Sequence, residues 1–315
     1  MFIFDHLTLA IMRAYTQLSK SYIPDEKYLF LGNGLNQLNI GYSWGDLLES
    51  IKDDSKIKTL IGNKTYPLYF EELSFAFDPK CEVERNITAL KKRIADNALA
   101  LQPNEFHRQI IGLNHYLHFL TTNYDYCIER VLDPSGKKLR HEDKLTSKYS
   151  LYRFNQINGH HVWHIHGECD NGRKHDSANS ILIGFEHYAD YLNKVHQILK
   201  SDTGKGLAEQ IAAARYNWPH KFFTHDIDIV GFCLDFNETH LWFILNFRAR
   251  LLRKKVTIKN KIRWFIPDLE TNNGDKADLL HMMQVEVVPL SGATYPEYYQ
   301  EFIKRIQNES HGKKA

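Results

Sequence analysis

Short apolar runs rich in β-branched and aromatic residues recur along the chain, and most are followed by a glycine or a cluster of polar residues. Runs of this kind are typical of buried β-strands. The expected strands cover residues 28–31, 116–121, 162–167, 180–184, 226–232, 261–265 and 285–288. Because several runs are apolar on both faces, we expect helices on both sides of the sheet.

Segments with apolar residues at helical spacing lie between these runs. The expected helices cover residues 2–18, 43–48, 68–77, 82–99, 104–113, 127–132, 185–199, 205–218, 239–252, 276–283 and 295–307. Strands that alternate with helices indicate an α/β fold with a doubly wound, mainly parallel, Rossmann-like sheet. We expect a single domain over residues 1–307, with an inserted helical layer from about 50–115 and 185–223, and a disordered tail over 308–315.

The composition narrows the function classes. A formal net charge of +2, with 43% hydrophobic and 25% charged residues, gives no electrostatic footprint for nucleic acid, so direct nucleic-acid binding is not expected. No apolar run is long enough to span a bilayer, and the N-terminal segment is typical of an amphipathic helix rather than a signal peptide. Cys81, Cys127, Cys169 and Cys233 lack Cys-x-x-Cys spacing, which favours a reducing, cytoplasmic location and no structural metal.

Polar residues follow several of the expected strands. The segment LHFLTTNYD at 117–125 places Asn123 and Asp125 directly after a buried run, and GNG, HIHG and GFCLDFNE follow other runs at 32, 164 and 231. In an open α/β sheet, ligands bind beyond the carboxyl ends of the strands. Taken singly, TTNYD can be a plain Asx-turn. GNG can be a simple tight turn, because Gln37 stands where the third glycine of a dinucleotide fingerprint would be.

The histidines near residue 164 allow a second interpretation. Period-two alternation places His164 and His166 on one strand face, where two imidazoles could bind a metal ion. No Glu-x-x-His or Asp-rich motif completes such a site. Metal-dependent hydrolysis is therefore the alternative to a strand with one catalytic histidine.

The motifs FLGNGLN, SWGDLL, TTNYD, HIHG and GFCLDFNETH stand in the order found in sirtuin-like proteins, and the chain resembles that family from about residue 29 to 288. Within the family it looks closest to bacterial sirtuin-like domains of antiphage defence systems. The pairing of TTNYD with HIHG about forty residues later is the most specific part of the resemblance. The resemblance implies a hydrolase that cleaves NAD to nicotinamide and ADP-ribose as the toxic effector of a defence system.

The same resemblance implies residue roles. Asn123 matches the catalytic asparagine that holds the nicotinamide ribose and the attacking water, and His166 matches the catalytic histidine. The implied NAD-contacting residues are Gly32, Asn33, Gly34, Asn36, Thr122, Asp125, Gly231 and Asp235. The glycine loop corresponds to the pyrophosphate-binding loop, and the acid after the asparagine supports the pocket.

The chain departs from the family in two places. Sirtuin deacylases carry a four-cysteine zinc module after the catalytic histidine, whereas only Cys169 and Cys233 follow here, which puts the acyl-lysine groove in doubt. The first loop reads GNG instead of Gly-Ala-Gly, and Asn36 stands where a serine is often found. Both changes fit the defence branch better than the deacylase branch.

A non-catalytic module that binds NAD or ADP-ribose and regulates a partner is a further alternative. Asn123 and His166 together favour the enzyme, because binding alone requires neither. The lack of an evident sensor domain predicts a homo-oligomer or a complex with a separate sensor or activator protein. Trp218, Phe222 and Phe223 are either core residues or a contact with another chain.

Overall fold

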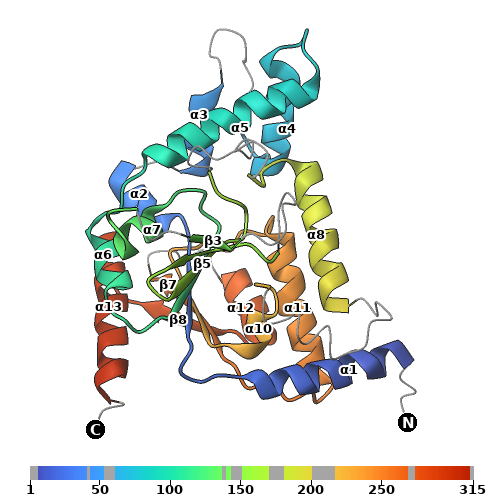
Figure 1. Ribbon diagram of the computed structural model, residues 1–315, viewed down its shortest axis with the longest axis vertical. Helices are drawn as coiled ribbons and strands as arrows, with labels where there is room; N and C mark the ends of the chain where they lie inside the picture. The colour runs from blue at the N-terminus through green and yellow to red at the C-terminus, as the bar shows by residue number, and fades with distance from the viewer. Residues whose placement is uncertain are drawn as a thin grey trace.

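One sheet runs through the centre of the computed structural model (Figure 1). The structure describes residues 6–40, 43–52, 61–136, 140–142, 151–169, 181–200, 217–268 and 274–312. The strands are β1 (Tyr28–Leu31), β2 (His118–Thr121), β3 (Arg140–Glu142), β4 (Phe154–Ile157), β5 (His160–His164), β6 (Ile227–Val230), β7 (Ile262–Pro267) and β8 (Glu286–Leu290). Over these residues the sheet has eight strands in the order β3-β4-β5-β2-β1-β6-β7-β8.

The six strands from β5 to β8 in this order are all parallel to their neighbours. Only the edge differs, where β4 pairs antiparallel with β5 and β3 antiparallel with β4. The strands that follow β1 in the chain are added first on one side of it, beginning with β2, and later on the other side, beginning with β6. The predicted α/β class with a doubly wound, mainly parallel sheet is confirmed. The β3–β4 hairpin is not among the strands that the sequence predicts.

The helices that connect the strands cover both faces of the sheet (Figure 1). They are α1 (His6–Leu18), α2 (Gly34–Ile40), α3 (Trp44–Ile51), α4 (Tyr66–Phe77), α5 (Val83–Ala100), α6 (Glu105–Ile111), α7 (Cys127–Leu132), α8 (Phe185–Lys200), α10 (Lys221–Thr224), α11 (Thr239–Arg253), α12 (Gly274–Met282) and α13 (Tyr295–Gly312). No described helix is both long enough and apolar enough to cross a bilayer.

Strand β1 shows how the sequence pattern builds the two-sided core. Tyr28 and Phe30 pack into one apolar cluster with α1, α8, α10 and α11, while Leu29 and Leu31 pack into another with α6 and α13. All four side chains are buried, because successive residues of a strand point to opposite faces and both faces carry helices. Phe222, from α10, belongs to the first of these clusters.

A third apolar cluster joins α3, α4 and α5 above the carboxyl ends of the strands (Figure 1). Tyr69, Phe70 and Leu90 are fully buried within it, and the segment after β2 adds Tyr124 and Tyr126. This cluster forms a roof over the end of the sheet where ligands bind in α/β folds. The inserted helical layer of the predicted fold is thus present in α3, α4 and α5, whereas α8 and α10, from the expected insertion over 185–223, pack on the sheet in the first cluster.

Two predicted features are wrong. Residues 181–184 form no strand. Leu182 N–H donates to the His166 carbonyl at 2.8 Å. Ile181 and Ile183 pack with the helical layer, whereas Leu182 packs into the first apolar cluster against the sheet.

The tail is not disordered from residue 308, because α13 continues to Gly312. Glu309 accepts from Arg263 at 2.7 Å and Ser310 bonds His115 at 2.8 Å, and both contacts fasten the last turns. The helix expected over 205–218 lies almost wholly outside the described residues, as do 313–315.

Candidate functional site

A cleft open to solvent lies between the carboxyl ends of the central strands and the helical roof. The predicted site residues that line it are Asn33, Gly34, Thr122, His166, Gly231 and Asp235. Aromatic side chains from other elements complete the wall: Trp44, Tyr66, Tyr124, Tyr188, Trp264, Tyr295, Tyr298 and Tyr299. Four segments that are far apart in the sequence therefore meet in one cleft, as the rule for strand ends requires.

The glycine loop lies against the end of β6. Gly32 N–H donates to the Val230 carbonyl at 3.1 Å, and Gly34 N–H donates to the Gly231 carbonyl at 2.9 Å. Gly231 has a φ of +63°, a left-handed conformation that glycine adopts without strain. The close approach of two backbones at this point explains why the loop is rich in glycine.

We expect Gly32→Ala to lower stability and NAD binding together. A Cβ at this position would lie 2.3 Å from the Gly231 carbonyl oxygen and 2.5 Å from the Phe232 Cα, and neither backbone atom can rotate away. Overpacking of this kind costs about 1–3 kcal/mol. Gly274→Ala is the matched control, since nothing lies within 4 Å of its added Cβ. Equal melting temperatures and NAD affinities for the two variants would contradict this account of the loop.

Asn36 and Asp125 join the first loop to the segment after β2. Asn36 Nδ2 donates to Asp125 Oδ2 at 2.7 Å and to Asn33 Oδ1 at 3.0 Å, while Asp125 Oδ1 accepts from Cys127 N–H at 2.8 Å. Asn36 and Asp125 are both buried. Neither lines the main cleft, so their geometry fits a brace between the two loops, with Asn33 the member of the group that faces the cleft.

Asn123 faces a second hollow of about 990 Å³ beside the main cleft. Its Nδ2 donates to the Gly32 carbonyl at 3.3 Å, and its Oδ1 is buried with no hydrogen-bond partner among the described residues. An unpaired buried amide oxygen is costly, which makes this atom a natural acceptor for a ligand hydroxyl or a water molecule.

Two aromatic rings stand between the hollows. Trp44 and Tyr124 line both of them and meet edge to face, with ring centroids 5.0 Å apart. The Tyr124 hydroxyl donates to the Leu182 carbonyl at 2.6 Å, which fixes the ring. The structure thus brings Asn123 and His166 into adjacent hollows rather than into a shared one.

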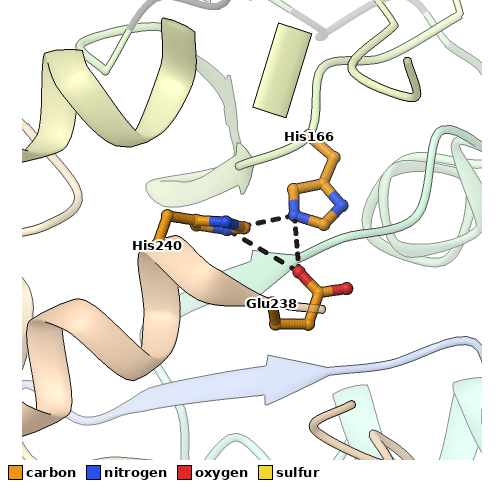
Figure 2. Close-up of side chains that lie close together, drawn as sticks. All are labelled: His166, Glu238 and His240. Atoms are coloured by element: carbon orange, nitrogen blue, oxygen red, sulfur yellow. Dashed lines mark hydrogen bonds and ion pairs between the residues drawn. The ribbon is translucent and has the colours of Figure 1, made fainter. Parts of the chain in front are cut away.

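His166 belongs to a buried polar cluster at the floor of the main cleft (Figure 2). Its Nε2 lies 3.1 Å from Glu238 Oε2 and 3.1 Å from His240 Nε2, and its Nδ1 lies 3.5 Å from the Tyr188 hydroxyl. His240 is fully buried, and this burial, with the neighbouring His166, holds its pKa well below the usual value. A neutral imidazole and a carboxylate therefore stand beside the histidine that the sequence assigns to catalysis.

The expectation that His164 and His166 share a face is wrong. Strand β5 ends at His164, and a turn with Gly167 N–H donating to the His164 carbonyl at 3.0 Å redirects the next residues. His164 contacts Glu129 on α7, on the opposite side from His166 and α11. A metal site built on these two histidines is therefore not assembled.

His164 bridges two parts of the site. Its Nε2 donates to Glu129 Oε1 at 2.7 Å and its Nδ1 donates to the Asn123 carbonyl at 2.7 Å. Burial alone would lower the pKa of His164, but the Glu129 carboxylate outweighs it and raises the pKa to about 9. Asn155 Nδ2 links Glu129 and Glu168 at 2.9 and 2.7 Å. A charged imidazole thus holds the backbone of Asn123.

Asp235 lines the cleft, but its Oδ1 already accepts from Asn237 N–H at 2.9 Å and from Asn237 Nδ2 at 2.6 Å. These bonds make an Asx-type turn that leads into α11. Glu238 and His240, which follow in the same GFCLDFNETH segment, were not assigned a role from the sequence. Their signal was the Glu-x-His spacing at the start of a helix, whereas Tyr188 on α8 carried none.

Comparison with known proteins gives one match. The family model described as SIR2-like domain matches residues 117–212, which include β2, the TTNYD and HIHG segments and α8. No curated protein matches the chain. The match supports a sirtuin-like family and, with it, an NAD-related enzymatic function in general, in agreement with the Rossmann-like sheet.

Proposed function

We propose that this protein hydrolyses NAD to nicotinamide and ADP-ribose. The observation that carries the proposal is the convergence of the GNG, TTNYD, HIHG and GFCLDFNE segments around the cleft at the carboxyl edge of the sheet. A cleft with apolar and aromatic walls and a few converging polar groups is typical of a cofactor-sized ligand site. The SIR2-like match over residues 117–212 supports NAD as that ligand.

The chemistry requires few groups. Cleavage of the nicotinamide–ribose bond builds positive charge on the sugar, nicotinamide leaves as a neutral molecule, and water adds to the sugar. We assign the placement of this water and of a ribose hydroxyl to Asn123, whose Oδ1 has no partner among the described residues. We assign the acceptance of the water proton to His166. General-base help of this type contributes roughly 10²- to 10⁴-fold to the rate.

The remaining residues bind and orient. Asn33 and Gly34 line the cleft and would lie against the pyrophosphate, while Gly32 holds the loop against the end of β6. Thr122 and Gly231 line the same cleft and would contact the nucleotide. Asn36 and Asp125 would keep the two loops in register through their 2.7 Å hydrogen bond.

One observation favours a second candidate, a module that binds NAD or ADP-ribose without cleaving it. Asn123 and His166 line different hollows, and the paired rings of Trp44 and Tyr124 stand between these hollows. On the hydrolase proposal, one substrate must reach both hollows, which share Asn33, Trp44 and Tyr124 as lining residues. A ligand that occupied only one of the two hollows would be bound and left intact, as the second candidate requires.

From the resemblance to defence proteins, we also propose a biological role and the partners of this protein. The chain would be the NAD-depleting effector of an antiphage system, active as a homo-oligomer or with a separate sensor protein. We further propose that the helical insertions and the sheet form one functional domain, because strands from both halves of the chain make one sheet.

We expect NAD to be converted to nicotinamide and ADP-ribose when the purified protein is incubated together with the products of its neighbouring genes. Liquid chromatography of the reaction and calorimetric titration of NAD give the two readouts. Binding of NAD without nicotinamide release under every combination would favour the regulatory module. Consumption of a different nucleotide, with NAD left intact, would show that the substrate is wrong.

A further inference from the structure

Three ligand-type atoms meet at the floor of the cleft: His166 Nε2, Glu238 Oε2 and His240 Nε2 (Figure 2). His166 comes from the turn after β5, Glu238 from the segment before α11, and His240 from the first turn of α11. The two imidazole nitrogens are 3.1 Å apart, and the carboxylate oxygen lies 3.1 Å from the first and 3.8 Å from the second.

These separations fit a metal ion. The point equidistant from three atoms so spaced lies about 2.0 Å from each, which is the length of a zinc–imidazole or zinc–carboxylate bond. Two histidines with one carboxylate are a donor set that zinc and related transition metals accept, with a further position left for water. We propose that His166, Glu238 and His240 bind one divalent transition-metal ion.

The side chains of the proposed metal site are held in place by packing in the absence of an ion. His240 is fully buried and its ring lies 5.3 Å from that of Tyr191, while the ring of His166 lies 5.5 Å from that of Tyr188. Glu238 Oε2 is buried and accepts no hydrogen bond within the described part of the chain, although it lies near both imidazoles. An ion would satisfy this oxygen. His166 and Glu238 also line the cleft, so the ion is reached from solvent.

A second cluster of possible metal ligands differs from this one in its hydrogen bonding. Glu129, His164 and Glu168 also lie within reach of one another. There, both His164 nitrogens are already hydrogen-bonded, and Asn155 donates to both carboxylates. Although Glu129 Oε2 is also buried without a hydrogen bond in the described part of the chain, the only histidine of this cluster has both nitrogens engaged, so it offers no free imidazole lone pair to an ion.

The consequence for activity rests on the function proposed above. An imidazole whose Nε2 ligates a metal ion has no free lone pair with which to accept the proton of the attacking water. The ion is therefore a reversible inhibitor of NAD hydrolysis, bound at the proposed base itself. Its removal by a chelator restores turnover.

The test begins with binding, which needs no activity. Full-length protein stripped with a chelator is titrated with zinc chloride, with stoichiometry from elemental analysis and affinity from a competing indicator. We expect one zinc ion per chain, and a loss of affinity of about 100-fold or more in Glu238→Gln, since loss of a direct ligand exceeds the 10- to 100-fold effect of a supporting residue. Zinc should raise the melting temperature of the unaltered protein and not that of Glu238→Gln.

Two variants serve as controls. His196→Gln removes an exposed imidazole from α8 and should bind zinc normally. Cys233→Ser tests the exposed thiol that lines the same cleft, and cobalt substituted for zinc should show no thiolate-to-metal absorption. Retention of zinc in Glu238→Gln, its loss in Cys233→Ser, or no binding by the unaltered protein would overturn the site. If the metal-free protein leaves NAD intact under all conditions, the proposed function fails while the binding result stands.

Discussion

Asn123→Ala and His166→Ala should each reduce nicotinamide release by at least about 10²-fold in the activated protein. Asn123→Ala removes the buried Oδ1 that has no partner among the described residues, and with it the group that places the water and the ribose. His166→Ala removes the proton acceptor, which alone accounts for roughly 10²- to 10⁴-fold. The double variant should be little worse than either single one, because groups that act as a unit are not additive.

The loss must come from chemistry and not from unfolding. Asn123→Ala breaks one hydrogen bond to the Gly32 carbonyl, which costs about 1 kcal/mol. Asn39→Ala is the matched control, because it also breaks a side-chain bond to a backbone carbonyl, at 2.8 Å, but on the exposed face of α2. The two variants should melt at similar temperatures while only Asn123→Ala loses turnover. Full turnover in His166→Ala would mean that another group accepts the proton.

The sequence correctly predicted the elements whose burial follows from their own run of apolar residues. β1 is apolar at every position, and its residues alternate between the two helix-covered faces as a buried parallel strand must. The strand ends were also located, since Asn33, Thr122 and His166 all reach the cleft. Each of these inferences needs only the chain near the residue in question.

The wrong predictions share a physical cause. The same local pattern of residues can fold in two ways, and packing against distant parts of the chain decides between them. The apolar run at 181–184 resembles a strand as much as β6 does, but it connects the helical roof, through Ile181 and Ile183, with the first core cluster, through Leu182. Along β5, side chains alternate between the two faces of the sheet only as far as His164, where the strand ends. Beyond it, Gly167 at a φ of +83° allows a turn that places His166 on the other side. The polar tail was expected to be disordered, yet Arg263 bonds Glu309 and His115 bonds Ser310, so the last helix extends into it.

The site shows the same limit. A resemblance of motifs assigns roles one residue at a time, and it does not say which side chains meet. Glu238 and His240 gain their place beside His166 from the start of α11, a helix more than seventy residues further along the chain. The same holds for His164, which the sequence offered only as a possible metal ligand beside His166. The structure joins it to Glu129 and to the backbone of Asn123.

The His164–Glu129 pair should be among the largest single contributions to stability, and this contribution should depend on pH. The pKa of His164 in the folded protein is about 9, above the value of about 6.5 for an unperturbed histidine. A group whose pKa rises on folding stabilises fully below its unfolded pKa and loses that effect as the pH rises through its folded pKa. The pair should therefore contribute on the order of 3 kcal/mol below about pH 6.5 and progressively less up to about pH 9.

His164→Ala should cost about 3–5 kcal/mol at pH 6.5, because it leaves the buried Glu129 carboxylate without its cation. Glu129→Gln keeps the shape and removes the charge that raises the pKa. It should therefore abolish the fall in stability between pH 6.5 and 9. His160→Gln is the matched control, since this half-buried histidine lies at the other end of β5 from His164 and bonds the Leu117 carbonyl. Urea denaturation of the four proteins at pH 6.5, 8 and 9.5 measures the effect, and a His164→Ala penalty that stays constant across this range would show that His164 is neutral in the fold.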